Sequence, residues 1–422
     1  MVNTEENGLV TSTRLFSIDG EPVVGRWSKD WPFAMEELGS ALTAGVHGVH
    51  HEYDSRSGRA TRLSFTDTQG APAINREVGY AALEVAYDER GNPVDERYLD
   101  VDGAPMLGPM QFFRLKVRYN DRGLLTETAV FGLDDEPSLG IRGYHRMKAK
   151  LNADGRTVEM RYLDAQGLPV TRVDEGCAVR TIGWDRQDEA WSKCFGPDGE
   201  PAEMIPHGVH HVVYQRDIAG RETALIAKDG RGHPAKHWGG FFSREYDYDS
   251  YGHITETRYF DAEHKPMLSR EGYARLVQEY DTSGNLVAES TFGSDGAPIS
   301  PPGRAGFRIE RQHDALGRVT LERVLGVDRQ PIQGLAQTEF AFDTFGNEIE
   351  RRFAVGDGGP ADDRLGYSRI GLAYDDYGQV IRMAWFTSDG LPAVSEEGCR
   401  VQTFNYDELG MQTGVKCIGE TD

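Results

Sequence analysis

The stretch Tyr280-Asp281-Thr282-Ser283-Gly284-Asn285, followed by Asp295-Gly296-Ala297-Pro298, sets the period of the whole 422-residue chain. Proline recurs at intervals of 32 or 33 residues, with one interval of 29. Fourteen residues before each proline the chain has glycine, except at Gln187. The prolines are Pro72, Pro105, Pro137, Pro169, Pro201, Pro234, Pro266, Pro298, Pro331, Pro360 and Pro392. An offset that holds through the whole series identifies a repeat protein, and such a period decides the fold class.

Each repeat has the pattern of two strands separated by turns. Asp or Asn usually stands three residues before the repeated glycine, often after an aromatic residue, as in Tyr280-Asp281. Asp caps the backbone of its own turn, and glycine accepts a positive φ. The flanking residues alternate, as in Ile370, Leu372 and Tyr374, which predicts half-buried strands. The second turn, Asp-Gly-x-Pro, ends the strand ladder because proline lacks a backbone donor.

We therefore predict an all-β protein, a tandem array of about twelve β-hairpin repeats of about 32 residues each. An isolated hairpin is marginal in water, so the array should form one continuous, twisted or spiralling antiparallel sheet. Residues 1–47 are predicted to hold an N-terminal half repeat and a capping helix over Lys29 to Thr43. Residues 48–422 are predicted to be a single β-hairpin repeat array.

The first turn of the repeat resembles the YD repeat of the RHS and teneurin-type families. The matching segments are Tyr87–Asn92, Tyr280–Asn285, His313–Arg318 and Phe342–Asn347. The resemblance extends from about residue 48 to residue 410. It implies a long spiralling sheet of hairpins that encloses a toxin or presents an adhesive surface, although this chain shows neither a C-terminal toxin nor a self-cleaving aspartyl motif. Tyr259–Pro266 is also similar to bacterial cell-wall and glucan-binding repeats.

The composition excludes several classes of partner. Lys and Arg number 46 against 68 Asp and Glu, so the formal net charge is −22. Bulk electrostatics therefore predict no binding to nucleic acid or to anionic lipid. The sequence contains no run of about 18 apolar residues, and we expect no membrane span. The residues from Met1 to Glu6 do not resemble a signal peptide.

The four cysteines fall into two pairs that flank first turns. Cys177 and Cys194 flank the turn that lacks its glycine, and Cys399 and Cys417 flank the last turn of the chain. Each pair occupies opposite strands at almost the same height, where directly opposed side chains come within reach of a disulfide. We predict the disulfides Cys177–Cys194 and Cys399–Cys417, with four free buried thiols as the alternative. Two disulfides would place the chain in an oxidising compartment, outside the cytoplasm, and the chain would then begin after a removed signal sequence.

The sequence contains no known catalytic signature. It has no G-x-S-x-G elbow, no phosphate-binding loop, no dinucleotide glycine fingerprint and no H-E-x-x-H motif. Its many carboxylates fall at turns and exposed strand positions, so no catalytic pair can be singled out. We therefore predict no catalytic residues, and the sequence favours a binding protein while leaving enzyme activity open.

Histidines are concentrated in one part of the chain, since residues 207–264 hold seven of the twelve. Imidazole is a common ligand of transition metals, and adjacent repeats would bring these rings together. The candidate metal ligands are His207, His210, His211, His233 and His237. The alternative is ordinary turn and core histidines, in which case no cofactor is expected.

Two further groups of residues are candidates for ligand binding. His47-Gly48-Val49-His50-His51 has the same sequence as residues 207–211, at an offset of 160 residues. Aromatic residues recur along the array and would stack on sugar rings if one exposed face carried them. The candidate ligand-binding residues are His47, His50, His51, Trp184, Trp191, Trp238, Tyr259 and Trp385. The alternative for the aromatic residues is burial in the core, as on most alternating strands.

These observations favour a non-catalytic binding or scaffold protein, located in the periplasm, in the medium or on the cell surface. Its repeat surface would be presented to a protein or polysaccharide partner, since repeat arrays offer long surfaces and acidic ones suit basic or neutral partners. Two alternatives stay open at this stage. One is a metal-binding protein or metal-dependent enzyme that uses the cluster from His207 to His237, and the other is a glycan-binding module.

Overall fold

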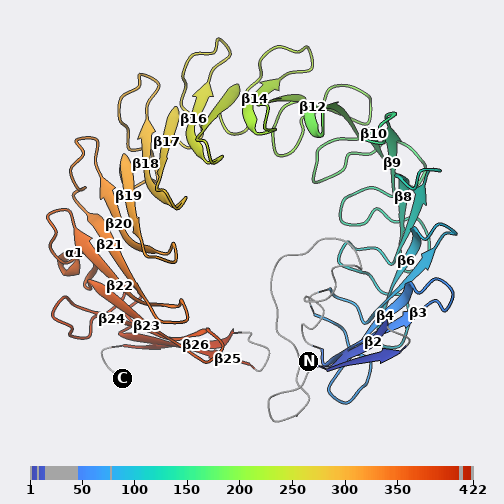
Figure 1. The fold of residues 1–422 in the computed structure, drawn as a ribbon, viewed down its shortest axis with the longest axis horizontal. Helices are drawn as coiled ribbons and strands as arrows, with labels where there is room; N and C mark the ends of the chain where they lie inside the picture. Colours follow the sequence, from blue (N-terminus) through green and yellow to red (C-terminus); the bar gives the residue numbers. More distant parts are fainter. Residues whose placement is uncertain (1, 7–8, 15–45, 77, 408–411, 420–422) are drawn as a thin grey trace. The chain divides into compact units, whose positions relative to one another are not determined.

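The computed structural model describes residues 2–6, 9–14, 46–76, 78–407 and 412–419. Its contacts divide the chain into two units, Met1–Pro206 and His207–Asp422. Within each unit, every strand pairs in an antiparallel sense with the next strand along the chain, so the colours of Figure 1 run in order along each unit. The predicted array of β-hairpins is confirmed.

The described residues of the first unit form twelve strands. They are β1 (Val2–Glu6), β2 (Leu9–Arg14), β3 (Gly48–Tyr53), β4 (Ala60–Thr66), β5 (Ala82–Tyr87), β6 (Pro93–Leu99), β7 (Arg114–Tyr119), β8 (Leu125–Phe131), β9 (Arg146–Leu151), β10 (Thr157–Leu163), β11 (Val179–Asp185) and β12 (Asp188–Phe195). The hairpin β1–β2 has no counterpart in the sequence prediction; it joins the array because Ser12, Thr13 and Arg14 of β2 pair with β3.

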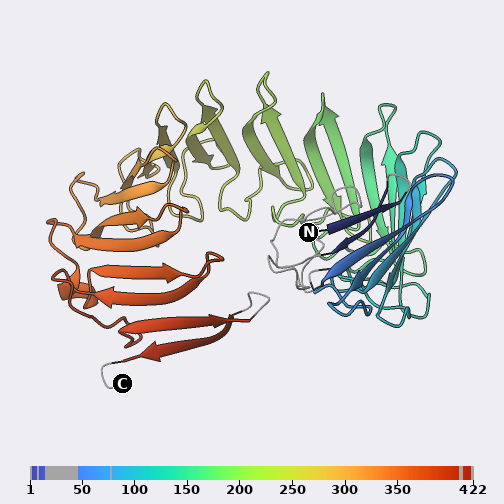
Figure 2. The same cartoon turned by 60° about the horizontal axis from the view of Figure 1, so that its bottom comes forward.

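In the described part of the second unit there are fourteen strands and one short helix. They are β13 (His211–Arg216), β14 (Glu222–Lys228), β15 (Ser243–Tyr248), β16 (Ile254–Phe260), β17 (Arg275–Tyr280), β18 (Leu286–Phe292), β19 (Arg308–His313), β20 (Val319–Leu325), β21 (Leu335–Phe342), β22 (Glu348–Val355), α1 (Asp362–Leu365), β23 (Arg369–Tyr374), β24 (Val380–Phe386), β25 (Val401–Tyr406) and β26 (Gln412–Ile418). In Figure 2 the strand direction changes progressively from the yellow to the red hairpins of this unit, as in a twisted sheet.

The first turn of most repeats is held by an aspartate or an asparagine. In the β17–β18 hairpin, Oδ1 of Asp281 accepts hydrogen bonds from the backbone N–H groups of Ser283 (2.8 Å) and Asn285 (2.9 Å). Gly284 has a φ of 86°, which places it in the left-handed region. A hydrogen bond from the Asn285 side-chain amide, followed by the backbone hydrogen bonds, holds the pKa of Asp281 below its usual value, so the carboxylate stays ionised.

The repeat that lacks its glycine has a first turn of a different type. Asp185 pairs with Asp188, so only Arg186 and Gln187 form the loop, and Arg186 takes the positive φ, at 52°. The other first turns have longer loops, such as Asp281 to Asn285 between paired residues Tyr280 and Leu286. The missing glycine therefore marks a shorter turn.

In several repeats the first turn also ties the repeat to the one before it. The Tyr248 hydroxyl donates a hydrogen bond to the Glu222 carbonyl (2.6 Å), and Arg221 stacks over the Tyr248 ring. The same bond joins Tyr87 to Ala60, Tyr374 to Glu348 and Tyr406 to Val380. Backbone pairing between hairpins is short, as in the three residue pairs that join β14 to β15. Side chains therefore supply much of the contact between repeats.

A third loop, between the second turn and the next hairpin, stacks on its equivalent in the preceding repeat. The backbone N–H of Trp238 donates to the carbonyl of His207 (2.9 Å), and the Trp238 ring lies against Gly208. Equivalent bonds run from Val173 to Arg142 and from Ile205 to Glu175. Gly208 has a φ of 67°, and a Cβ there would lie 1.6 Å from the Trp238 ring. Glycine is thus required at this position by both backbone and packing.

The two faces of each sheet differ in chemistry because side chains alternate along a strand. One face holds the core, made in the first unit around Leu63, Phe65, Tyr80 and Leu83. In the second unit the core lies around Val212, Leu225, Phe241, Tyr259 and Tyr273. The opposite face carries ion pairs that cross from repeat to repeat. Examples are Arg62–Glu84 at 2.9 Å and Arg369–Glu350 at 3.0 Å.

The predicted half repeat at Phe16 to Pro22 and the capping helix over Lys29 to Thr43 lie outside the described residues. In the described part of the chain, no helix has both the length and the apolar character that a membrane crossing requires.

Candidate functional site

Two of the candidate metal ligands are in direct contact. His207 Nδ1 lies 3.0 Å from His237 Nε2, at the junction of two stacked third loops. Nδ1 of His237 accepts a hydrogen bond from the Gly239 N–H (2.8 Å), so we assign the neutral ring its proton on Nε2, where it donates to His207. The His237 ring stacks on Phe241 at 4.5 Å.

Burial, assisted by the neighbouring His207 and Arg244, lowers the pKa of His237 to about 4. The ring is therefore neutral near neutral pH. Its two nitrogens are already used, one by the Gly239 N–H and one by His207. This pair serves to join adjacent loops.

The other three candidate ligands lie elsewhere in their repeats. His210 is buried at the start of a hairpin, and His211 begins β13, where it pairs with Lys228. His233 is largely exposed on a second turn, with its Nδ1 3.5 Å from Asp229. Among the residues that the structure describes, no group of three or more His, Cys, Asp or Glu side chains is placed to hold a metal ion.

The two copies of the sequence His-Gly-Val-His-His do not occupy equivalent positions in their repeats. Gly48 lies in β3 and pairs with Thr66, whereas the equivalent position in the second copy is His211, which pairs with Lys228. The two copies are thus shifted by three residues, and His47 corresponds to His210. The shift arises because the spacing of the hairpins between them is not a constant 32 residues.

The first copy of this motif is also used in packing. His47 is buried, and its N–H donates to the Thr66 carbonyl. His50 Nε2 lies 3.2 Å from the Thr66 hydroxyl. The His51 ring stacks on Tyr53, and burial together with His50 lowers the pKa of His51. The three histidines therefore do not converge on a common ligand site.

The predicted row of sugar-stacking aromatics is wrong for two of its members. Tyr259 and Trp385 are only 8% and 6% exposed, and both lie in hydrophobic cores. Trp184 takes the place of the inter-repeat tyrosine, and its indole Nε1–H donates to the Thr157 carbonyl (2.8 Å).

The other two members are Trp191 and Trp238. Trp191 is half-buried, lies against Gly183 and stacks with Lys193. Trp238 is 48% exposed, with its ring against Gly208. The five aromatic residues therefore do not form one exposed face. Alternation along a strand could not reveal this, because the core aromatics have the same spacing.

Both predicted disulfides, Cys177–Cys194 and Cys399–Cys417, are present, with Cα atoms 5.2 and 5.3 Å apart. The predicted register is wrong, because the residue opposite Cys194 is Arg180 and the one opposite Cys417 is Gln402. In each pair the first cysteine lies three residues before the residue that is opposite the second cysteine. It therefore lies in the loop that leads into the hairpin. The loop turns back toward the second strand and brings the sulfur atoms together.

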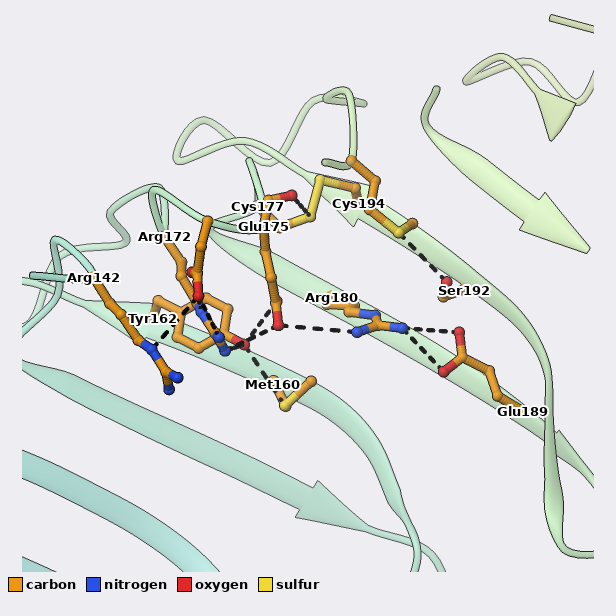
Figure 3. Close-up of polar contacts among 12 residues, drawn as sticks. Arg142, Met160, Tyr162, Arg172, Glu175, Cys177, Arg180, Glu189, Ser192 and Cys194 are labelled. Atoms are coloured by element: carbon orange, nitrogen blue, oxygen red, sulfur yellow. Dashed lines mark hydrogen bonds and ion pairs between the residues drawn. A yellow bond between two sulfur atoms is a disulfide. The ribbon is translucent and has the colours of Figure 1, made fainter. Parts of the chain in front are cut away.

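A buried polar network adjoins the first disulfide (Figure 3). The hydroxyl of the fully buried Tyr162 donates to Glu175 (2.8 Å) and accepts from Arg172 (3.0 Å). Arg172 is also bidentate to Asp174, and Arg180 pairs with Glu189 in the next hairpin. The sequence carries no signal for this network, since its members come from the strands β10, β11 and β12 and from a third loop.

The role of this network is structural. Burial, then the Glu175 charge, raises the pKa of Tyr162 above its usual value, so its proton is retained. A phenol with no exposed surface cannot reach a substrate. Arg172 satisfies both the tyrosine oxygen and the Asp174 carboxylate, as buried polar groups require. The network fixes the loop that carries Cys177.

No known family profile matches the chain, and no curated protein matches it in sequence. Among solved structures, TcdB2-TccC3-Cdc42 is 12% identical, with a TM-score of 0.35 over 89% of this chain and 21% of that chain. A TcdB2-TccC3 structure is also 12% identical, with a TM-score of 0.28 over 97% and 24%.

The Photorhabdus luminescens Tc holotoxin pore is 13% identical, with a TM-score of 0.26 over 87% of this chain and 23% of that chain. This protein thus spans about a fifth to a quarter of the length of the chains it matches. Its resemblance to the RHS and YD-repeat families is carried by the turns of its own repeats.

Proposed function

We propose that this protein is a non-catalytic scaffold that works outside the cytoplasm and presents its hairpin repeats to a protein partner. The observation that carries the proposal is the use of its reactive side chains. Tyr162, Trp184, His207 and His237 bond to neighbouring loops or repeats. The turn aspartates are likewise occupied by their own backbone. The groups that could perform chemistry are committed to holding the array together.

A protein is the partner class that the surface favours. The net charge of −22 suits a basic partner. A polysaccharide would need an exposed aromatic row, and two of the five aromatic residues proposed for that role are buried in the core. Antiparallel hairpins that add one after another also provide a long surface, which is what repeat proteins use for binding other proteins.

The two disulfides support the extracytoplasmic location, because thiols are kept reduced in the cytosol. The test is to isolate the protein from the organism that makes it, alkylate it without reductant and measure its intact mass. We expect no alkylated cysteine. Alkylation of all four cysteines in the native protein would contradict the proposed location.

The binding role is tested by covalent cross-linking of the tagged protein in its native extracytoplasmic fraction, followed by mass spectrometry of the linked chains. The expected result is one basic protein cross-linked in near-stoichiometric amount. Recovery of bound polysaccharide in place of a protein, or turnover of a substrate by the purified chain, would overturn the proposal.

Metal binding at the histidines remains a second candidate, and the observation that favours it is the 3.0 Å contact between His207 and His237. Elemental analysis of the purified protein tests it directly. One equivalent of zinc, copper or nickel that is lost in the His207→Ala, His237→Ala double variant would establish the site.

A further inference from the structure

The first turns of three consecutive repeats in the second unit carry large apolar side chains that point into solvent. The residue before the turn glycine is Leu316, then Phe345, then Tyr377. Their exposed fractions are 78%, 90% and 78%. Exposed apolar residues are ordinary when scattered, but a regular series of them marks an interaction surface. We call these three residues the turn ridge.

The fold does not require apolar side chains at these positions. The turn uses only the backbone of the residue before glycine, as when the N–H of Leu316 donates to Oδ1 of Asp314 (2.9 Å). The N–H groups of Phe345 and Tyr377 make the same bond to Asp343 and Asp375. The backbone geometry of the turn therefore does not determine which side chain stands there.

Two residues at the equivalent position in the first unit have a structural role. Arg90 and Arg122 stand at the same place in their turns and reach the next turn along the array. Arg90 donates to the Asp121 carbonyl, and Arg122 donates to the Ala153 carbonyl at 2.7 Å. A leucine side chain and a phenylalanine ring carry no donor for such a bond. Leu316 and Phe345 thus depart from the pattern of these two turns.

The surroundings of the ridge are acidic. The three turns contain Asp314, Asp343, Asp375 and Asp376, against one cation, Arg318. Arg318 is bound to Asp314 at 2.6 Å and stacks over the Phe342 ring, so its charge is locally balanced. A partner on this surface must offer apolar groups between positive charges.

The spacing of the ridge suggests the form of that partner. Adjacent hairpins are two strands apart, which is about 10 Å. Seven residues of an α-helix also rise about 10 Å, so a helix with apolar residues at every seventh position matches the period of the ridge. We propose that Leu316, Phe345 and Tyr377 form a docking site for a basic amphipathic helix of a partner protein. The inference rests on the proposed scaffold function and names the surface and the partner chemistry.

The test uses a fluorescent peptide of about 18 residues, helical, with leucines about seven residues apart and lysines beside them. Its binding to the full-length protein is measured by anisotropy, with a peptide of scrambled sequence as the reference. The variant Leu316→Ser, Phe345→Ser, Tyr377→Ser removes the ridge. A matched control, Val327→Ser with Leu391→Ser, removes exposed apolar residues from second turns of the same unit. Thermal unfolding confirms that both variants fold.

We expect the ridge variant to raise the Kd of the peptide at least about tenfold, with little change in the control variant, since a few apolar anchors dominate such interfaces. Binding should also weaken with salt, because the turn carboxylates contribute. Equal binding by the ridge variant, or equal binding of the scrambled peptide, would overturn the docking site. A concentration-dependent dimer that only the ridge variant loses would instead assign the ridge to a second copy of this chain.

The two proposals fail in different ways. If the cross-linked partner of the native protein is still captured by the ridge variant, the scaffold function stands and the docking site is wrong. If neither a protein partner nor the peptide binds the unaltered protein, both proposals are wrong.

Discussion

Cys177 and Cys194 occupy the positions in their repeat that an aromatic pair occupies in others. Tyr80 and Tyr98 have ring centroids 5.0 Å apart, as do Tyr144 and Tyr162 at 4.9 Å and Phe241 and Tyr259 at 5.2 Å. Each aromatic pair is separated by 18 residues, as is Cys399–Cys417. Cys177–Cys194 is separated by 17, because its turn is shorter. The same contact between loop and strand is thus made by packing in some repeats and covalently in two.

Removing this cross-link should loosen its own hairpin first. Cys177→Ala with Cys194→Ala is expected to cost about 3 kcal/mol of local stability, as for a closed loop of this length. Hydrogen exchange of β11 and β12 amides is the measurement, since repeat arrays open locally. Cys177→Tyr with Cys194→Tyr is the matched variant and should recover part of the loss. Unchanged exchange in the alanine variant would show that packing alone holds the loop.

The bond from Tyr248 to the Glu222 carbonyl predicts a measurable coupling between repeats. Tyr248→Phe should lower the free energy of unfolding by about 1 kcal/mol, because it removes one hydrogen bond and leaves the carbonyl unpaired. The control is Tyr251→Phe, three residues along the same turn and 81% exposed, which should change stability by less than about 0.5 kcal/mol. Urea unfolding compares the two variants. Equal losses would mean that the hydroxyl of Tyr248 does not link the repeats.

Gly208 and Gly232 allow backbone strain to be separated from packing. Both have a positive φ, but a Cβ on Gly208 would meet the Trp238 ring, whereas a Cβ on Gly232 would meet nothing within 4 Å. Gly232→Ala should cost about 1 kcal/mol from strain alone. Gly208→Ala should cost about 1–3 kcal/mol more, measured by thermal unfolding. Adding Trp238→Ala to Gly208→Ala should relieve part of that excess; an excess that persists would locate the clash elsewhere.

The histidine pair predicts that acid weakens the third-loop stack. The unfolded chain binds a proton at His237 near pH 6.5, whereas burial lowers the pKa of the folded ring to about 4. Between these values the unfolded state binds more protons, so the contribution of His237 is complete above about pH 6.5 and is lost as the pH falls toward 4. The charged groups facing the ring are His207 and Arg244.

His237→Asn provides the comparison, because the amide oxygen can still accept the Gly239 N–H without titrating in this range. The melting temperatures of both proteins should be measured from about pH 7.5 to pH 4.5. The advantage of the unaltered protein should shrink steadily below about pH 6.5. A difference that is independent of pH would show that the ring is not shielded from protonation.

The hairpins could be predicted because their turns carry a local signal. Asp281 and Gly284 are needed at fixed places by one turn, so they recur at a fixed offset. Pairing of the cysteines followed from the same period. The period did not predict their register. The register depends on how a third loop folds back, and the loop residues have no alternating pattern from which their positions could be predicted.

The candidate sites were less predictable because they depend on contacts between repeats. His47 and His207 look alike in sequence but occupy positions three residues apart in the repeat. Tyr259 and Trp385 have the same strand spacing whether they face the core or solvent, and only the structure places them in the core. The turn ridge had a sequence signal, in the large apolar residues at Leu316, Phe345 and Tyr377, but its meaning required their exposure.

The inter-repeat bonds of the first turn have a consequence for how such a chain can evolve. The Tyr248 hydroxyl donates to the main-chain carbonyl of Glu222, and the Trp184 indole N–H donates to the main-chain carbonyl of Thr157. The accepting residue therefore contributes no side chain to the bond. A substitution at the accepting residue therefore leaves this bond intact. The accepting positions can change in sequence without a compensating change in the next repeat, while the order of the array is preserved.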